Sequence, residues 1–355
     1  MMKSTSRTNL SQQVNESAIK AGVPSVRSDT RNWFVQVCLV ALVVFLLPKM
    51  LIPNAYMQGV ATLLFIYIIL SISFQTLFGQ AGLVSFGHSA MFGLGAYFST
   101  FFVTKYQVSY PLAWGAALLA VLIIAVFVGS VILRLGMLFL AVVTLSLCKA
   151  TILIISQLTV LGGDDGLSVP LAVEDVSDRH IFNYFLAGIP MCLVLAVALA
   201  LRSTRIGREI KAIGDDPVAS ACCGIPVGRR RIQVFALSSG LAAFAGMIFA
   251  QTNAFISPSS FDIGSGILIL AMVAIGGLKS VWGAVAGATF LIILPEVAAP
   301  LQELNQLVYG LVLILVFRFA PHGIMGIIES IRHGVSRIEE KRKTSTLSTK
   351  GSKDL

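Results

Sequence analysis

Charged residues are scarce in this 355-residue chain, where Asp, Glu, Lys and Arg together make up 12% of the sequence. A typical soluble domain has roughly 25% charged residues. Hydrophobic residues make up 56%, and the mean hydropathy is +0.86. This balance excludes a water-exposed globule and indicates a membrane protein.

Residues that support metal binding, disulfides or catalysis are also few. The five cysteines show no CxxC spacing, and the four histidines form no pair with metal-ligand spacing. The sequence has no GxxxxGK[ST] phosphate loop, and GGLKS at Gly276 lacks both its spacing and its GK pair. We therefore expect no cofactor or metal in this chain, no ATP hydrolysis by it, and no disulfide framework.

Long apolar segments fill most of what remains. A membrane-spanning helix needs about 20 mostly apolar residues, and the sequence predicts an all-α polytopic membrane protein of about ten spans, with eight to ten as the range. Some spans are expected to be broken or re-entrant. The ten candidates are 33–52, 57–78, 83–104, 111–133, 135–157, 183–201, 232–252, 265–282, 285–300 and 306–319.

The basic residues predict the orientation of these spans. Of the 26 Lys and Arg residues, ten spans would place all but a few on one side, in the N-terminal tail, the 202–231 loop and the C-terminal tail. Such an excess marks the cytoplasmic side, so both termini are predicted to be cytoplasmic. The 158–182 loop, which carries five Asp and Glu residues, would then face the outside.

The domain organisation follows from the same pattern. Residues 1–32 are predicted to form a disordered cytoplasmic tail, 33–320 the transmembrane domain, and 321–355 a basic cytoplasmic tail. The net charge of +9 does not indicate nucleic-acid binding. The basic residues lie beside spans, where they set orientation and meet anionic lipid headgroups.

A glycine-rich stretch, Gly79 to Tyr97 (GQAGLVSFGHSAMFGLGAY), is the first candidate for a functional site. A helix would align its small residues on one face, which allows close helix packing in a membrane. Polar groups at membrane depth are costly unless they face protein or water. The stretch therefore fits either a translocation path or a tightly packed helix pair. Its candidate residues are Gly79, Gln80, Gly82, Ser85, Gly87, His88, Ser89 and Gly93.

Small residues recur every fourth position in more than one place. Ala81, Ser85, Ser89 and Gly93 form one ladder, and a second runs from Gly276 through Ser280, Ala284 and Ala288. Transporters often contain internal repeats with sites near the bilayer midplane. The two ladders thus suggest a possible internal repeat, with Gly276, Gly277 and Ser280 added to the candidate path, although ladders also serve packing alone.

Two polar residues at membrane depth have alternative interpretations. His88 could gate or contact a substrate, or could hold packing through a hydrogen bond. Lys149, inside the fifth predicted span, could snorkel outward, pair with an acidic group, or face a pore, and the first two are favoured.

The longest predicted cytoplasmic connection, 202–231, contains a short helix with strong boundary signals. Its first part looks helical from Gly207, and Asp215 precedes Asp216 and Pro217, a strong helix start. The second helix should stop at Gly224, a good C-terminal cap. With little apolar bulk it cannot anchor in lipid, so it either docks into a groove of another protein or forms a simple turn.

This loop resembles the coupling loop of bacterial ABC-importer permeases, whose signature is Glu-Ala-Ala, three residues, then Gly. The matching positions here are Val218, Ala219, Ser220 and Gly224, with Val for Glu and Ser for the second Ala. The rest of the chain resembles LivM-type permeases of the branched-chain amino acid subgroup. The matching segments, in order over about residues 55–330, are GQAGLVSFGHSAMFGLGAY, RLGMLFLAVVTLSL, LGGDDG, GREIKAIGDDPVASACCGIPV, FALSSGLAAFAGMIFA and AMVAIGGLKSVWGAVAGA.

The resemblance implies a permease subunit in a bacterial inner membrane. Its partners would be a second, LivH-like permease, two cytoplasmic ATPases that hold the ATP, an extracytoplasmic substrate-binding protein, and membrane lipid. Residues Gly207, Asp215, Asp216, Pro217, Ala219, Ser220 and Gly224 would couple to the ATPases, and the outer LGGDDG motif contributes Gly162, Gly163 and Gly166.

The expected substrates are branched-chain or other hydrophobic amino acids, with urea or short amides as the alternative. An ion-coupled secondary transporter is a second class of function. It should show intramembrane carboxylates, but Asp and Glu fall almost entirely in loops. An intramembrane enzyme would need paired His, Asp or Ser groups at membrane depth, and none is evident.

Overall fold

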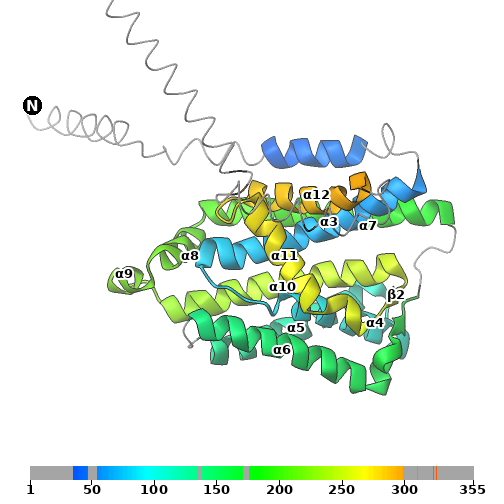
Figure 1. Ribbon diagram of the computed structural model, residues 1–355, viewed down its shortest axis with the longest axis horizontal. Coiled ribbons are helices and arrows are strands. Elements are labelled where there is room, and N and C mark those ends of the chain that lie inside the picture. The colour runs from blue at the N-terminus through cyan, green and yellow to red at the C-terminus, as the bar shows by residue number, and fades with distance from the viewer. Residues whose placement is uncertain are drawn as a thin grey trace, which may run out of the picture.

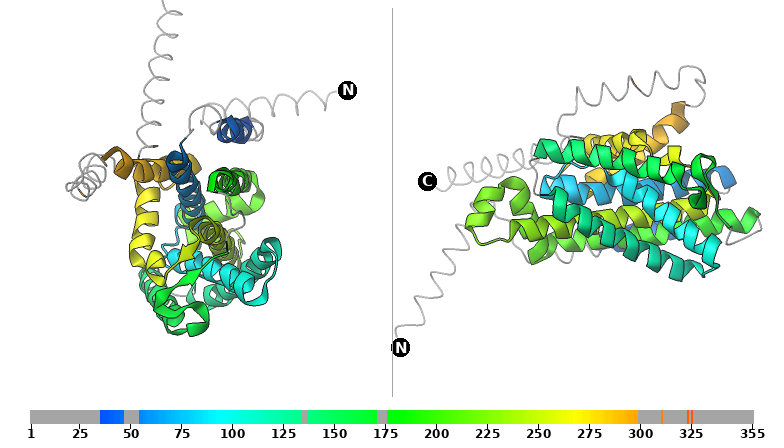
Figure 2. Two further views of the ribbon diagram at one scale, coloured as in Figure 1. Left: turned by 90° about the vertical axis from the view of Figure 1, so that its right-hand side faces the viewer. Right: turned by 90° about the horizontal axis from the view of Figure 1, so that it is seen from below.

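The computed structural model describes residues 35–46, 54–133, 137–170 and 176–298, together with 310, 323 and 325. Long helices lie side by side along the longest dimension, and most are seen end-on in the left view of Figure 2 (Figures 1 and 2). The all-α polytopic prediction is confirmed. The proposed tails and the predicted tenth span, 306–319, lie almost entirely outside the described residues.

Nine helices make up the described bundle. They are the Val35–Leu46 helix, α3 (Ala55–Gln75), α4 (His88–Tyr106), α5 (Tyr110–Ile132), α6 (Met137–Gln157), α7 (Val176–Ser203), α10 (Val227–Asn253), α11 (Ile263–Gly276) and α12 (Val281–Ala298). A π-helical turn, Thr76–Gln80, extends α3. Within the described ranges, six segments are long and apolar enough to cross a membrane, and Val35–Leu46 and Val281–Glu296 are shorter apolar helices.

The core forms around α10, which packs against α3, α4 and α5, while α3 also packs against α7, α11 and α12. These central helices are rich in small residues. A side chain at Gly95 of α4 would overlap the Ala243 backbone of α10, and one at Gly246 of α10 would overlap the Phe92 carbonyl of α4. Such close approach of backbones is how membrane helices associate when lipid offers no hydrophobic drive.

The outer helices are apolar on their exposed faces as well. Only 28% of the α5 span and 22% of the α6 span are buried, against 72% of the α3 span. Their exposed side chains include Ile123 and Phe127 on α5 and Phe139 and Leu153 on α6. These faces are suited to lipid or to another membrane subunit.

The two ends of the bundle carry different elements: two short helices at one end and a pair of short strands at the other (Figure 1). At one end lie α8 (Arg205–Asp215) and α9 (Pro217–Cys222), beyond the ends of the long helices. At the other end, β1 (Leu167–Ser168) pairs antiparallel with β2 (Phe255–Ile256), with Leu167 opposite Ile256. A 3₁₀ turn, Pro258–Phe261, leads from β2 into α11.

Candidate functional site

Two breaks between helices, one after α3 and one between α11 and α12, meet at one place. A side chain at Gly79, in the π-helical turn, would overlap the carbonyl of Leu278, and the Gln75 Nε2 donates to that carbonyl at 3.1 Å. Leu278 lies in the turn between α11 and α12, where Gly277 has φ of +116°. Sequence positions two hundred residues apart therefore form one contact at the end of the bundle that carries α8.

The first small-residue ladder does not lie on one helix, so that expectation was wrong. Residues 82–87 form a loop after α3, and α4 begins only at His88 instead of at the predicted residue 83. Gly82 has φ of +68°, a conformation that ends the helix and that side chains other than glycine rarely adopt. Ser85 and Gly87 lie in this loop, and the Ser85 hydroxyl accepts from the Gly87 amide at 3.3 Å.

The second ladder is also split. Gly276 ends α11 and Ser280 precedes α12, so that only Ala284 and Ala288 share a helix. The small residues still serve close packing, because a side chain at Gly276 would overlap the carbonyl of Gly283 on α12. The predicted spans 265–282 and 285–300 correspond to α11 and α12, with the break displaced toward residues 277–280.

His88 joins three helices. Its imidazole is 2% exposed, and Nε2 lies 2.6 Å from the Ser238 hydroxyl of α10 and 3.2 Å from the Ser73 hydroxyl of α3. The two serines also bond reciprocally, because the Ser73 hydroxyl donates to the Ser238 carbonyl and the Ser238 hydroxyl to the Ser73 carbonyl. Of the two interpretations of His88, this geometry favours packing. Its partners are the hydroxyl groups of two serines on neighbouring helices.

Ser89 and Gly93 follow on α4 and do share a face. The Ser89 hydroxyl lies 3.1 Å from the Cys148 sulfur of α6, and a Cβ at Gly93 would stand 3.0 Å from the Phe261 ring. Phe261 is buried in the 3₁₀ turn before α11 and stacks edge-on against Phe92 at 5.1 Å. The small residues of α4 thus make room for a turn that enters the bundle.

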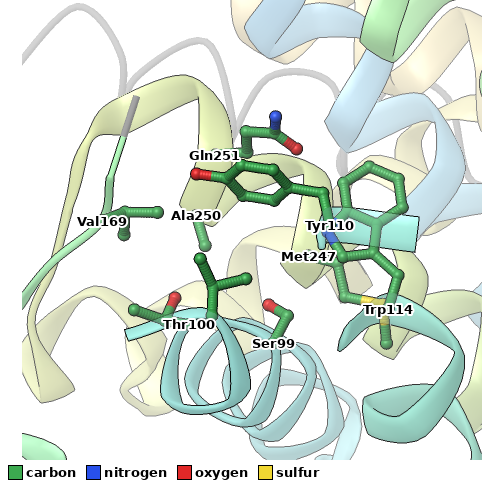
Figure 3. A pocket seen from close by; sticks show the side chains of 9 residues that line it. Ser99, Thr100, Tyr110, Trp114, Val169, Met247, Ala250 and Gln251 are labelled. Atoms are coloured by element: carbon green, nitrogen blue, oxygen red, sulfur yellow. The ribbon is translucent and has the colours of Figure 1, made fainter. Parts of the chain in front are cut away.

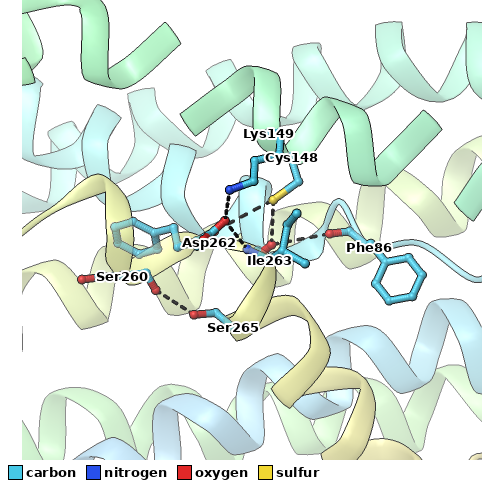
Figure 4. A network of polar contacts seen from close by, with 9 residues as sticks. Phe86, Cys148, Lys149, Ser260, Asp262, Ile263 and Ser265 are labelled. Carbon is cyan, nitrogen blue, oxygen red and sulfur yellow. Dashed lines mark hydrogen bonds and ion pairs between the residues drawn. The ribbon is translucent and has the colours of Figure 1, made fainter. Parts of the chain in front are cut away.

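That turn ends in an ion pair, and only one of its two members, Lys149, could be identified from the sequence. Lys149 Nζ lies 2.8 Å from Asp262 Oδ1 (Figure 4), and the same oxygen accepts from the Ile263 amide at 2.6 Å and caps α11. Lys149 lies near the middle of α6, whose 21 residues span about 31 Å, close to the hydrocarbon thickness of a bilayer. Both side chains are about half exposed, at 50% and 46%.

The predicted coupling loop forms two helices, as expected. Thr204 caps α8 by accepting from the Gly207 amide at 3.1 Å, and a side chain at Gly207 would overlap the Leu201 carbonyl. Glu209 binds Arg230 at 2.6 Å and Arg205 at 2.9 Å. The hydrogen bond from Arg230, reinforced by Arg205, holds the pKa of the Glu209 carboxyl below its ordinary value. The contact between Glu209 and Arg230 joins α8 to the start of α10.

The short helix α9 has the predicted boundaries. Asp216 Oδ1 accepts from the amides of Val218 and Ala219 at 2.8 and 3.0 Å, and Pro217 occupies the first turn. Gly224 has φ of +80° and follows Cys223, the residue that caps the end of the helix. Ser220 is buried, whereas Val218 is 74% exposed and α9 projects from the bundle (Figure 1). The loop therefore presents a small, rigid, exposed helix, not a simple turn.

The LGGDDG motif lies at the opposite end of the bundle. Gly162, Gly163 and Gly166 all have positive φ, and a side chain at Gly166 would overlap the carbonyl of Ile256 in β2. The glycines allow two tight turns before β1, and Asp164 and Asp165 are exposed. This motif is thus far from the Gly79–Leu278 contact, and the structure does not bring all candidate residues together.

A cavity beneath these strands is drawn in Figure 3. It is lined by residues of α4, α5, α10 and the β1 segment, including Ser99, Tyr110, Val169 and Gln251. Its volume is about 10 Å³. A cavity of that size holds about one water molecule, so it is no substrate site.

The fold and these features define a class: a multi-pass α-helical membrane protein with an exposed, capped helix at its basic end. A family model for the permease component of branched-chain amino acid transport systems matches residues 56–317. The chain belongs to this family of transport permeases.

Individual relatives agree. The chain is 28% identical over 314 residues to the high-affinity branched-chain amino acid transport system permease protein LivM of Escherichia coli K12, covering 81% of this chain and 74% of that protein. It is 28% identical to LivM of Salmonella typhimurium, covering 75% and 69%. It is also 31% identical to the autoinducer 2 import system permease protein LsrC of Klebsiella pneumoniae, covering 46% and 49%. No significant match to a solved structure was found.

Proposed function

We propose that this chain is the membrane-spanning permease subunit of an ABC importer that moves branched-chain or other hydrophobic amino acids inward. Two separate cytoplasmic ATPases would supply the energy, a second LivH-like permease would complete the pore, and an extracytoplasmic binding protein would deliver the substrate. The chain would lie in a bacterial inner membrane with both termini in the cytoplasm.

The observation that carries this proposal is α9. Its rigid cap at Asp216 and its exposed face project from the basic end of the bundle, which the positive-inside rule assigns to the cytoplasm. Since α8 is tied to α7 through Thr204 and to α10 through Glu209, a push on α9 would reach the long helices. A short helix fixed in this way suits the transmission of force from an ATPase.

The Lys149–Asp262 pair supports the need for a further membrane subunit. Both side chains are about half exposed near the middle of α6, and such an ion pair would be costly if it faced acyl chains. The α6 face that carries Lys149 is therefore expected to meet the second permease or water in the assembled importer. The LsrC relatives are named for a different cargo, so the amino acid assignment depends on the greater coverage by LivM.

Co-purification with the partner ATPases tests the coupling role. Val218→Arg places a charge on α9, and we expect it to abolish recovery of the ATPases while the permease still accumulates in the membrane. Val160→Arg is the matched control, because Val160 is also an exposed valine, 56% exposed, but lies at the opposite end. Equal recovery of the ATPases with both variants would overturn the proposal.

A further inference from the structure

A cavity of about 560 Å³ opens at the basic end of the bundle. Four elements form its walls: the π-helical turn after α3, the end of α7, α8, and the turn between α11 and α12. Its lining comprises Phe78, Gly79, Gln80, Gly82, Arg202, Gly207, Arg208, Lys211, Gly214, Asp215, Leu278 and Lys279. A volume of this size accommodates a small ligand or a lipid headgroup.

Positive charge dominates this lining. Four cationic side chains, Arg202, Arg208, Lys211 and Lys279, face one carboxylate, Asp215. Asp215 approaches Lys279 at 3.7 Å, and both side chains are mostly exposed. Arg208 donates to the Ser203 carbonyl at 2.8 Å, which is a backbone acceptor, and no carboxylate of the described residues forms an ion pair with it. The cavity therefore attracts anions.

A buried amide adds a hydrogen-bond donor that has no acceptor. Gln80 is 7% exposed, and within the described part of the chain its Nε2 has no hydrogen-bond partner. Buried polar groups are almost always paired. Because Gln80 lines the same cavity as the four cations, the missing acceptor is most simply an oxygen of a bound anion.

The walls are built by close backbone contacts. A side chain at Gly214 would overlap the Gln80 carbonyl, and Gly82, with φ of +68°, faces Gly214. These contacts hold α8 against the end of α3 and keep Gln80 beside the cations. The cavity is thus a built feature of the fold.

The depth of the cavity identifies the source of the anion. It lies where α7 ends at Ser203 and α11 ends at Gly276, and the ends of membrane-spanning helices are expected to lie near the lipid headgroups. Basic pockets between helices at this level bind anionic headgroups. We propose that the cavity binds a phosphate group, and that in the membrane this phosphate belongs to an anionic phospholipid. The bound headgroup would brace α8 and, through Asp215, the base of α9.

Phospholipid binding by the assembled importer tests the proposal. The complex is purified in detergent, titrated with phosphatidylglycerol or phosphatidylcholine, and measured by native mass spectrometry and by thermal unfolding. We expect phosphatidylglycerol, and not phosphatidylcholine, to bind and to raise the unfolding temperature. In the double variant Arg208→Gln/Lys211→Gln its apparent affinity should fall about tenfold or more, since each basic group contributes to headgroup attraction.

The matched control removes the same charge outside the cavity. Arg229→Gln/Arg231→Gln alters the same end of the bundle, and neither residue lines the cavity. We expect it to keep wild-type affinity, whereas an equal loss would indicate general surface attraction and overturn the site. Gln80→Met conserves charge and volume, and should also weaken binding. Unchanged binding in both cavity variants would overturn the proposal as well.

A parallel titration with inorganic phosphate separates the two sources of the anion. Stabilisation by free phosphate that phosphatidylglycerol does not reproduce would overturn the lipid assignment. The readouts are binding and unfolding, so they do not depend on which solute the importer carries or on whether the proposed function holds.

Discussion

Single residues determine how closely the elements of this bundle approach one another. Gly79 is the clearest case, because its backbone lies against Leu278 in the turn between α11 and α12. His88 is another, since one imidazole joins hydroxyl groups of α3 and α10. Both residues were predicted as members of a path or a packing face, and their positions at the contacts between helices favour packing.

Gly79→Ala should destabilise the chain, because its methyl group would overlap the Leu278 carbonyl; forced overpacking typically costs about 1–3 kcal/mol. Gly59→Ala is the control on α3 itself, since no atom lies within 4 Å of the added group. Thermal unfolding of the purified protein should show a lower midpoint for Gly79→Ala only. A loss of the same size at Gly59 would show that the effect is not due to the contact with Leu278.

Lys149 and Asp262 should behave as a coupled pair. Removing one charge leaves the other unpaired at membrane depth, so Lys149→Met should sharply lower the amount of folded protein. Replacing a paired charge together with its partner is often neutral, so Lys149→Met/Asp262→Leu should recover much of this loss. Membrane expression and size-exclusion profiles measure both. If Lys149→Met alone has no effect, the pair does not contribute to stability.

At the scale of elements, the sequence predicted the ends of a short helix correctly, but it did not predict which residues meet across the bundle. Asp216, Pro217 and Gly224 predicted the bounds of α9 because capping acts over neighbouring residues. The ladder from Ala81 to Gly93 predicted a single helix wrongly, because its spacing fits a helix although the backbone at Gly82 ends one. The partner of Lys149, 113 residues away, could not be found from spacing at all.

The contact between α8 and α10 should weaken in acid. The pKa of Glu209 is lowered in the folded state, so its stabilising effect is full above the ordinary value of 4.5 and is lost as pH falls through the lower folded pKa. Glu209→Gln should therefore be less stable than wild type at neutral pH, and this difference should shrink as the pH falls below 4.5. Unfolding midpoints at several pH values measure it. A difference that does not change with pH would contradict the role of this carboxylate.

At the scale of the whole molecule, charge separates the two ends. Among the described residues, α8 and its neighbours carry Arg205, Arg208, Lys211 and Lys279, while the β1 end carries the exposed Asp164 and Asp165. Composition and charge sufficed to predict an all-helical membrane protein with opposite faces. The path itself could not be predicted, because the spacing of small residues does not distinguish a translocation path from helix packing.

Labelling in intact cells tests the orientation. In a variant without native cysteines, Asp164→Cys should react with a membrane-impermeant thiol reagent, because it lies on the proposed outer face. Val218→Cys on α9 should react only after the membrane is opened. The reverse pattern would show that the bundle is inserted the other way round.

We propose that this chain imports amino acids only together with ATPase partners. The most direct measurement is uptake of radiolabelled leucine into vesicles that contain the chain, the second permease, the ATPases and the binding protein, with ATP on the ATPase side. We predict uptake that requires ATP and every partner, and that urea does not compete with. Uptake by this chain alone, driven by an ion gradient without ATP, would contradict the account.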